Sequence, residues 1–168
     1  VPQKVLKAAK FGSEKDTVAT YNYYYMTLYN YYYNMSNQYD TYYGKGMGKM
    51  YTGYDTSKTP MDQEYTGDTS SLNTDEEIKT WADFLRVSAL NYMQSYTAYA
   101  DLARKNGLSL NDEEKAEIDE RVSSIKKSAD NNDFSLDRYI QKIYGKGVTE
   151  KVLRAALEDS TLASKYAQ

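Results

Sequence analysis

The chain has 168 residues, of which 40% are hydrophobic, enough to build a globular core. Its 21 lysines and arginines against 24 aspartates and glutamates give a net charge of −3 and no basic block, which excludes nucleic acid as a partner. The absence of cysteine and histidine excludes disulfides, the usual zinc sites, and thiol or imidazole catalysis. No apolar run approaches the about 20 residues of a membrane-spanning helix. Because the chain opens at Val1 without methionine, we expect that an upstream segment has been removed.

The N-terminal third is dominated by tyrosine. Residues 4–10, before a turn at Gly12, can form one short strand. Residues 17–43 contain no glycine, proline or other turn signal and are too long for a strand, so they predict a helix. A projection at about 100° per residue gathers one apolar stripe within an arc of about 120°. The stripe consists of Val18, Tyr21, Tyr25, Leu28, Tyr29, Tyr32, Met35 and Tyr39.

We interpret the tyrosines of this stripe as core residues whose hydroxyl groups reach the edge of the core. Four further tyrosines fall outside it: Tyr23, Tyr24, Tyr31 and Tyr33. These four rings need a second surface to contact, and three explanations remain open. The following loop can cover them, another domain can pack on them, or they can bind an apolar partner, as rigid aromatic surfaces do at low entropy cost.

Residues 44–73 hold five glycines, many hydroxyl side chains and Pro60, with no sustained period, and so predict a long irregular loop. Loops of this length in compact domains are usually functional or mobile. The next helix is predicted over 74–106, with a capping box from Thr74 to Glu77. Such a helix would be about 50 Å long in a domain about 40 Å across, so it must kink or project.

Three shorter helices complete the prediction. They cover residues 111–130, 135–144 and 149–167, with Asn111, Ser135 and Thr149 as the capping residues. Val148 precedes the last cap and is placed to pack on Leu153. The expected fold class is therefore all-α, with about five helices in a single domain over 1–168.

The chemistry-bearing clusters have structural explanations. We interpret the acidic residues at 75–77 and 112–114 as helix-start residues rather than an acid/base pair or a metal site. The tetrapeptide Tyr-Gly-Lys-Gly occurs at 43–46 and 144–147, and such a turn before a helix could hold an anion. At 144–147, a helix end followed by a new cap also explains every residue. We predict no catalytic residue, no metal site and no cofactor.

Two segments resemble the N-terminal helical domain of SurA/PrsA-type extracytoplasmic foldases, especially those of Gram-positive anaerobes: GLSLNDEEKAEIDERVSSIKKSA and FSLDRYIQKIYGKGVTEKVLRAALEDSTLASKYA. Upstream, the stretches YNYYYMTLYNYYYN, YDTSKTPMDQEY and TWADFLRVSA resemble the earlier part of the same domain. The resemblance extends from about Lys10 to Tyr166. Its most specific parts are YGKGVTEK and the terminal LASKY.

The resemblance implies an extracytoplasmic protein, often lipid-anchored, whose helical arms hold unfolded or newly exported polypeptides. A parvulin-type prolyl isomerase domain commonly follows in this family. Parvulin active sites use histidines and this chain has none, so we expect no isomerase activity from it and no parvulin domain within it. Membrane attachment would run through a lipid anchor outside this chain, and a homodimer is compatible with the family.

Our candidate contacts for a client polypeptide come from the tyrosines outside the stripe and from the single tryptophan. They are Tyr23, Tyr24, Tyr31, Tyr33 and Trp81. The alternative hypothesis is a cell-surface adhesion or glycan-binding domain, because tyrosine and tryptophan rings also stack on sugars.

Overall fold

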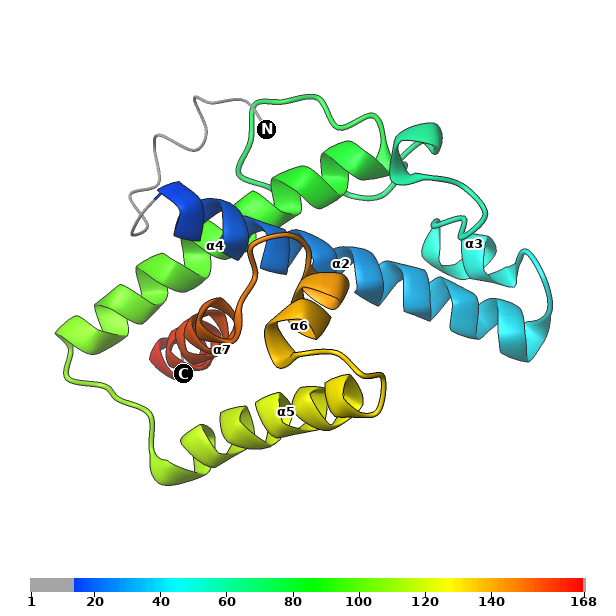
Figure 1. Cartoon of the computed structure of the whole chain (residues 1–168). Coiled ribbons are helices and arrows are strands. Elements are labelled where there is room, and N and C mark those ends of the chain that lie inside the picture. Colours follow the sequence, from blue (N-terminus) through cyan, green and yellow to red (C-terminus); the bar gives the residue numbers. More distant parts are fainter. Residues whose placement is uncertain (1–13, 168) are drawn as a thin grey trace. The chain divides into compact units, whose positions relative to one another are not determined.

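The computed structural model describes residues 14–167, with side chains described from Thr17 onward. The described part is all-α, with one isolated antiparallel bridge in place of a sheet (Figure 1). This confirms the predicted fold class. The strand predicted at residues 4–10 lies outside the described residues.

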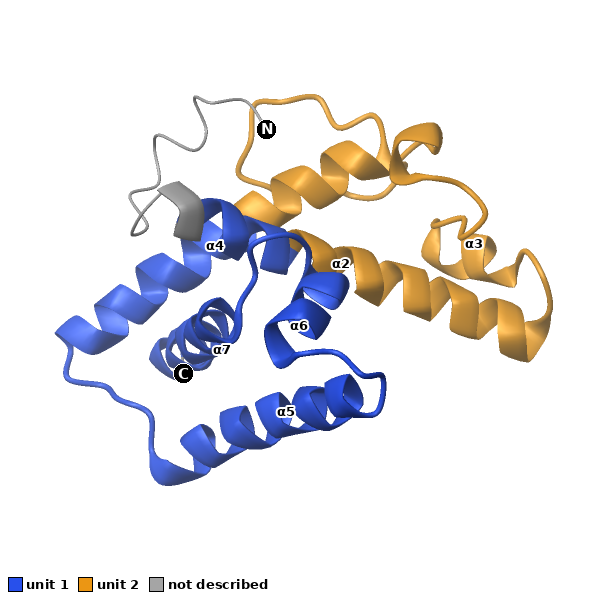
Figure 2. Ribbon diagram, viewed as in Figure 1, with its two compact units in different colours: residues 1–24, 92–168 blue, residues 25–91 orange. Residues whose placement is uncertain are grey.

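The helices are α2 (Glu14–Tyr43), α3 (Met47–Thr52), η1 (Pro60–Asp62), α4 (Trp81–Lys105), α5 (Asp112–Asp130), α6 (Leu136–Tyr144) and α7 (Glu150–Tyr166). The chain divides into two compact units (Figure 2). Unit 1 comprises residues 1–24 and 92–168, and unit 2 comprises residues 25–91. Helices α2 and α4 each contribute one part to unit 1 and the other part to unit 2.

Helix α2 is continuous over the tyrosine-rich segment, as predicted, but its burial does not follow one stripe. Val18 was predicted in the stripe and is 39% exposed, whereas Tyr23 and Tyr24 were placed outside it and are buried. The reason is that α2 changes partners along its length. Its residues up to Tyr24 pack in unit 1 and those from Tyr25 onward in unit 2, so a single projection cannot describe both.

The prediction that a helix begins at Thr74 is wrong, because α4 begins at Trp81. Its cap is formed by Thr80 and Asp83, which bond reciprocally. The Thr80 N–H donates to Asp83 Oδ2 at 3.0 Å, and the Asp83 N–H donates to Thr80 Oγ1 at 3.2 Å. Thr74 forms only a local turn, in which its Oγ1 accepts the Glu76 N–H at 3.0 Å. With 25 residues, α4 is about 37 Å long, shorter than the predicted domain diameter.

A distant backbone pairing explains why the helix starts late. The Tyr65 N–H donates to the Lys79 carbonyl oxygen at 2.9 Å, and the Trp81 N–H donates to the Gln63 carbonyl oxygen at 3.1 Å. These bonds form the antiparallel bridge and keep the chain before Trp81 extended. The acidic residues at 75–77 therefore precede α4 and do not occupy its first turn.

The segment predicted as a long loop contains two short helices, α3 and η1. The buried side chain of Gln63 stabilises the turn at Asp55, between α3 and η1, by hydrogen bonds. Its Oε1 accepts the Asp55 N–H at 2.8 Å, and its Nε2 donates to the Asp55 carbonyl oxygen at 3.1 Å. The segment is therefore ordered by hydrogen bonds and by the packing of its Tyr54 and Tyr65 rings against Trp81, without a regular hydrophobic period.

The repeated Tyr-Gly-Lys-Gly segments form the same turn at the ends of α2 and α6. Positive φ angles occur at all four of its glycines: Gly44, Gly46, Gly145 and Gly147. In each copy, a side chain six residues earlier accepts the N–H of the second glycine. Asp40 Oδ1 accepts from Gly46 at 2.9 Å and also from Gly48 at 2.7 Å, while Gln141 Oε1 accepts from Gly147 at 3.2 Å. The anion held by the first turn is thus the protein's own Asp40 carboxylate.

In unit 1, α5, α6 and α7 pack against one another pairwise. Two of the three caps predicted there have their side-chain bonds. Asn111 Oδ1 accepts the Glu114 N–H at 2.8 Å while Glu114 Oε2 accepts the Asn111 N–H at 2.7 Å, and Thr149 Oγ1 accepts the Val152 N–H at 3.4 Å. Ser135 stands at the start of α6 without a side-chain capping bond.

Candidate binding surface

Tyr23 and Tyr24 belong to the core of unit 1, where they are 5% and 6% exposed. The Tyr23 ring centroid lies 5.1 Å from that of Tyr144 in α6, and Tyr24 stacks on Tyr96 of α4 at 5.8 Å. Burial, with smaller contributions from Tyr23 and Asp159, raises the pKa of the Tyr24 hydroxyl far above its ordinary value. The second surface that these rings needed is supplied by α4 and α6. Burial leaves neither ring a face for a client, which corrects their assignment as client contacts.

Trp81 is the centre of the unit 2 core and is 3% exposed. Four rings surround it at centroid distances of 4.8 to 5.5 Å: Tyr32, Tyr54, Tyr65 and Phe84. Its indole N–H donates to the Gly53 carbonyl oxygen at 3.1 Å. Trp81 is therefore a packing residue, and its assignment as a client contact is corrected as well.

The remaining two predicted contacts differ from each other. Tyr33 is half-buried against the unit 2 core and stacks on Tyr29 at a centroid distance of 5.8 Å. Tyr31 is 58% exposed and meets Tyr32 edge to face at 5.2 Å. Of the five predicted contacts, Tyr31 is the one that presents most of its ring to solvent.

Three tyrosines that were not predicted as client contacts form another group, which we call the tyrosine cluster: Tyr39, Tyr43 and Tyr51. Tyr39 was predicted in the core stripe and is half-buried. Tyr39 stacks on Tyr51 at 4.9 Å and on Tyr43 at 6.0 Å. Tyr43 and Tyr51 are 68% and 59% exposed, and the neighbouring Met50 is 73% exposed. The sequence pattern missed this cluster because α3, which carries Tyr51, is too short to show a period.

Exposed apolar side chains are concentrated in one part of the chain. Among the described residues, every large apolar side chain that is more than half exposed lies in unit 2. These side chains are Tyr31, Tyr42, Tyr43, Met50, Tyr51 and Met61. The exposed apolar residues of unit 1, such as Tyr99 at 47%, keep more of their surface covered.

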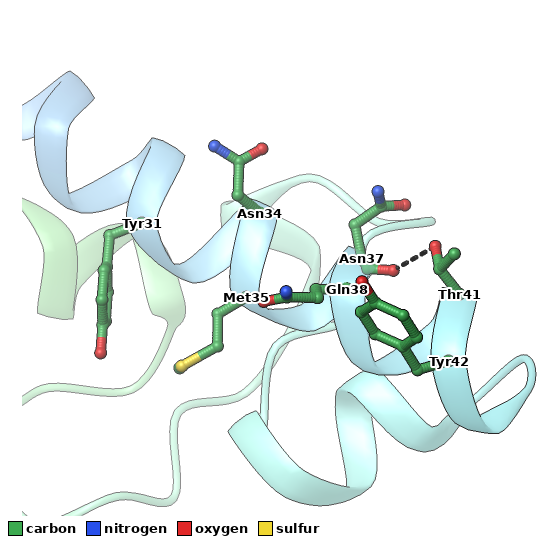
Figure 3. A pocket seen from close by; sticks show the side chains of 7 residues that line it. All are labelled: Tyr31, Asn34, Met35, Asn37, Gln38, Thr41 and Tyr42. Atoms are coloured by element: carbon green, nitrogen blue, oxygen red, sulfur yellow. Dashed lines mark hydrogen bonds between the residues drawn. The ribbon is translucent and has the colours of Figure 1, made fainter.

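A shallow groove of about 710 Å³ follows α2 within unit 2 (Figure 3). It is lined by Tyr31, Asn34, Met35, Asn37, Gln38, Thr41 and Tyr42. Along α2, Tyr31 and Tyr42 lie toward the two ends of this set and the Gln38 amide lies between them, whereas Asn34 and Asn37 point to the opposite side from the Tyr31 ring (Figure 3). None of the seven lining side chains carries a charge.

A metal site and a membrane-spanning helix are both absent from the described residues. No three carboxylates in this part of the chain gather closely enough to hold a metal ion. Its helices also include none that is both long and apolar enough to span a bilayer. Comparisons with family models, with curated proteins and with solved structures find no match for the chain.

Proposed function

We propose that the chain is a chaperone-like module that binds unfolded or newly exported polypeptides through the tyrosine cluster and Met50. The observation that carries the proposal is the gathering of exposed tyrosine and methionine side chains in unit 2. Within this set, the rings of Tyr39, Tyr43 and Tyr51 contact one another. Exposed apolar side chains that lie together in this way mark a site of interaction. Unfolded polypeptides expose the apolar side chains that such a surface can cover.

The residue types suit a partner without a fixed shape. Tyrosine offers a large rigid ring with little conformational entropy to lose, and its hydroxyl group bonds to peptide groups or water. Methionine is flexible and polarisable, so Met50 can adapt to different client side chains. Promiscuous binding proteins combine these properties in this way.

The resemblance of YGKGVTEK and LASKY to SurA/PrsA-type foldases supports the same function. On this proposal the chain is the non-catalytic part of an extracytoplasmic foldase that is anchored to the membrane through a lipid outside this chain. Since the chain contains no histidine, we propose that it has no isomerase activity of its own. Measurable turnover of a proline-containing test peptide by this chain would contradict that part of the proposal.

The proposal is tested by diluting a chemically denatured client into buffer with and without the chain and following light scattering. The wild-type chain should slow aggregation, and the double variant Tyr43→Ser, Tyr51→Ser should lose most of this effect. Both side chains are more than half exposed, so helicity measured by circular dichroism should not change. Tyr99→Ser is the matched control, because Tyr99 is exposed in unit 1. Equal suppression by all three proteins would remove the tyrosine cluster from the proposal.

A further inference from the structure

We infer that the groove along α2, lined by residues between Tyr31 and Tyr42, binds a second kind of ligand, a neutral oligosaccharide. This site is separate from the tyrosine cluster, and the inference does not depend on the proposed polypeptide binding. It rests on three properties of the seven lining residues: their lack of charge, their hydrogen-bonding groups and the position of their rings.

The first property is the absence of charge. No charged residue occurs from Thr17 to Tyr39, although charged residues make up 27% of the chain. The outward face of a helix normally carries charged side chains. In α2 the exposed positions Asn34, Asn37 and Gln38 hold amides instead. Such a face has no electrostatic attraction for an ionic ligand and does not oppose the approach of a neutral one.

The second property is the supply of both donors and acceptors. Each of the three amides carries two N–H donors and a carbonyl acceptor on one side chain. The Thr41 hydroxyl donates to the Asn37 main-chain oxygen at 2.8 Å, which leaves its lone pairs as acceptors. Sugar hydroxyl groups also donate and accept at the same atom. Asn34 lies three residues before Asn37 and four before Gln38, the spacing that places it beside each of them on a helix.

The third property is an aromatic ring at each end of the groove. Tyr31 and Tyr42 are 58% and 72% exposed. They are separated by eleven helical positions, or about 16 Å along the axis, which exceeds one sugar ring and fits a short oligomer. The electron-rich face of a tyrosine attracts the polarised C–H groups on a sugar face. The edge-to-face contact with Tyr32 at 5.2 Å supports the Tyr31 ring.

The lining also distinguishes this ligand from a polypeptide. Polypeptide side chains need apolar contacts, and the tyrosine cluster with Met50 offers rings and a thioether without any amide side chain among them. In the groove, Met35 is the single aliphatic lining residue, while four of the seven residues are amides or a hydroxyl-bearing threonine. The balance of lining groups therefore favours a hydroxyl-rich ligand.

The test uses the full chain labelled with ¹⁵N and titrated separately with cellohexaose, maltohexaose and chitohexaose. We expect saturable shifts of the side-chain amide signals of Asn34, Asn37 and Gln38 with at least one of these probes. Tyr31→Ala and Tyr42→Ala should each weaken binding by about tenfold or more, the loss expected when an aromatic ring that carries a main contact is removed. Binding should persist when salt is raised from about 50 to about 500 mM, because no charge pair forms.

Tyr43→Ser, Tyr51→Ser is the control, since it removes the tyrosine cluster and should leave sugar binding unchanged. The inference is overturned if none of the three hexasaccharides gives saturable shifts. It is also overturned if binding survives both ring substitutions, or if an unfolded polypeptide shifts the groove amides and the sugars do not. Polypeptide binding is tested with Tyr43→Ser, Tyr51→Ser, and sugar binding is tested with Tyr31→Ala and Tyr42→Ala. Either proposal can therefore fail while the other is supported.

Discussion

Gly48 is buried where α3 touches α2, and its lack of a side chain permits this contact. A Cβ atom at Gly48 would overlap the carbonyl oxygen and the Oγ of Ser36. The Ser36 carbonyl oxygen belongs to the main chain of α2, so a side-chain rotation of Ser36 cannot relieve this overlap. The same Ser36 is fully buried and donates its hydroxyl to the Tyr54 carbonyl oxygen at 2.6 Å. This pair therefore sets how closely α3 approaches α2, and with it the position of Tyr51.

We expect Gly48→Ala to lower the free energy of unfolding by about 1 to 3 kcal/mol, the range for overpacking a closed contact. Urea unfolding followed by circular dichroism measures the change. Adding Ser36→Ala should not restore stability, because the main-chain oxygen stays in place. Lys49→Ala is the control at the neighbouring exposed position and should have little effect. An unchanged unfolding midpoint for Gly48→Ala would show that α3 does not hold this contact.

The start of α4 shows whether local sequence or a long-range backbone pairing decides where a helix begins. Thr80→Ala removes the bonded cap and should lower the free energy of unfolding by about 1 kcal/mol. Thr74→Ala removes the residue that local pattern favoured, and it should change stability by much less because no helix begins there. Unfolding curves of the two variants, measured under the same conditions, show which of the two threonines caps the helix. A larger loss for Thr74→Ala would place the helix start where the sequence pattern predicted it.

The α4 cap also predicts a pH dependence. Burial is the largest influence on the pKa of Asp83 and acts to raise it, but hydrogen bonds from Thr80 and Lys79 and the charge of Arg86 together outweigh it. The pKa in the folded state is therefore below its unfolded value. It follows that the carboxylate stabilises the fold above about pH 4 and that this contribution is lost as pH falls through the folded pKa.

Asp83→Asn isolates this contribution. Between about pH 6 and pH 3, the wild-type chain should lose stability more steeply than the variant, because the other carboxylates titrate in both. The unfolding free energy measured at each pH gives the two slopes. Parallel slopes would mean that the Asp83 carboxylate is not stabilised in the fold.

The helix starts also show which features of the fold can be predicted from the sequence alone. The caps at Asn111 and Thr149 were predictable because each depends on residues within one helical turn. The start of α4 was not predictable, because it is decided by a backbone bond from Trp81 to Gln63, far away in the chain. The tyrosine cluster was missed for a related reason, since Tyr51 joins Tyr39 through a six-residue helix with no period of its own.

The two compact units share the 20 tyrosines and use them differently. In unit 1, rings such as Tyr23 and Tyr24 fill a core among helices. In unit 2, rings pack around Trp81 while the tyrosine cluster stays exposed. Predicting this division required knowing that α2 passes from one unit into the other, which no single helical projection contains.

The uncharged character of the tyrosine cluster predicts how client binding responds to salt. Since tyrosine and methionine side chains supply the contacts, raising salt from about 50 to about 500 mM should leave suppression of aggregation intact. Acidic and basic clients should be protected alike, apart from a small effect of the net charge of −3. Loss of protection in high salt, or protection of basic clients only, would point to charged residues elsewhere on the chain.

Client binding by the tyrosine cluster is tested most directly by a residue-by-residue map of the client site. The ¹⁵N-labelled chain is titrated with a reduced and carboxymethylated model client that cannot refold. We expect saturable chemical-shift changes centred on Tyr39, Tyr43, Met50 and Tyr51, which disappear in the Tyr43→Ser, Tyr51→Ser variant. Shifts confined to unit 1, or the absence of any saturable shift, would contradict a client-binding role for the tyrosine cluster.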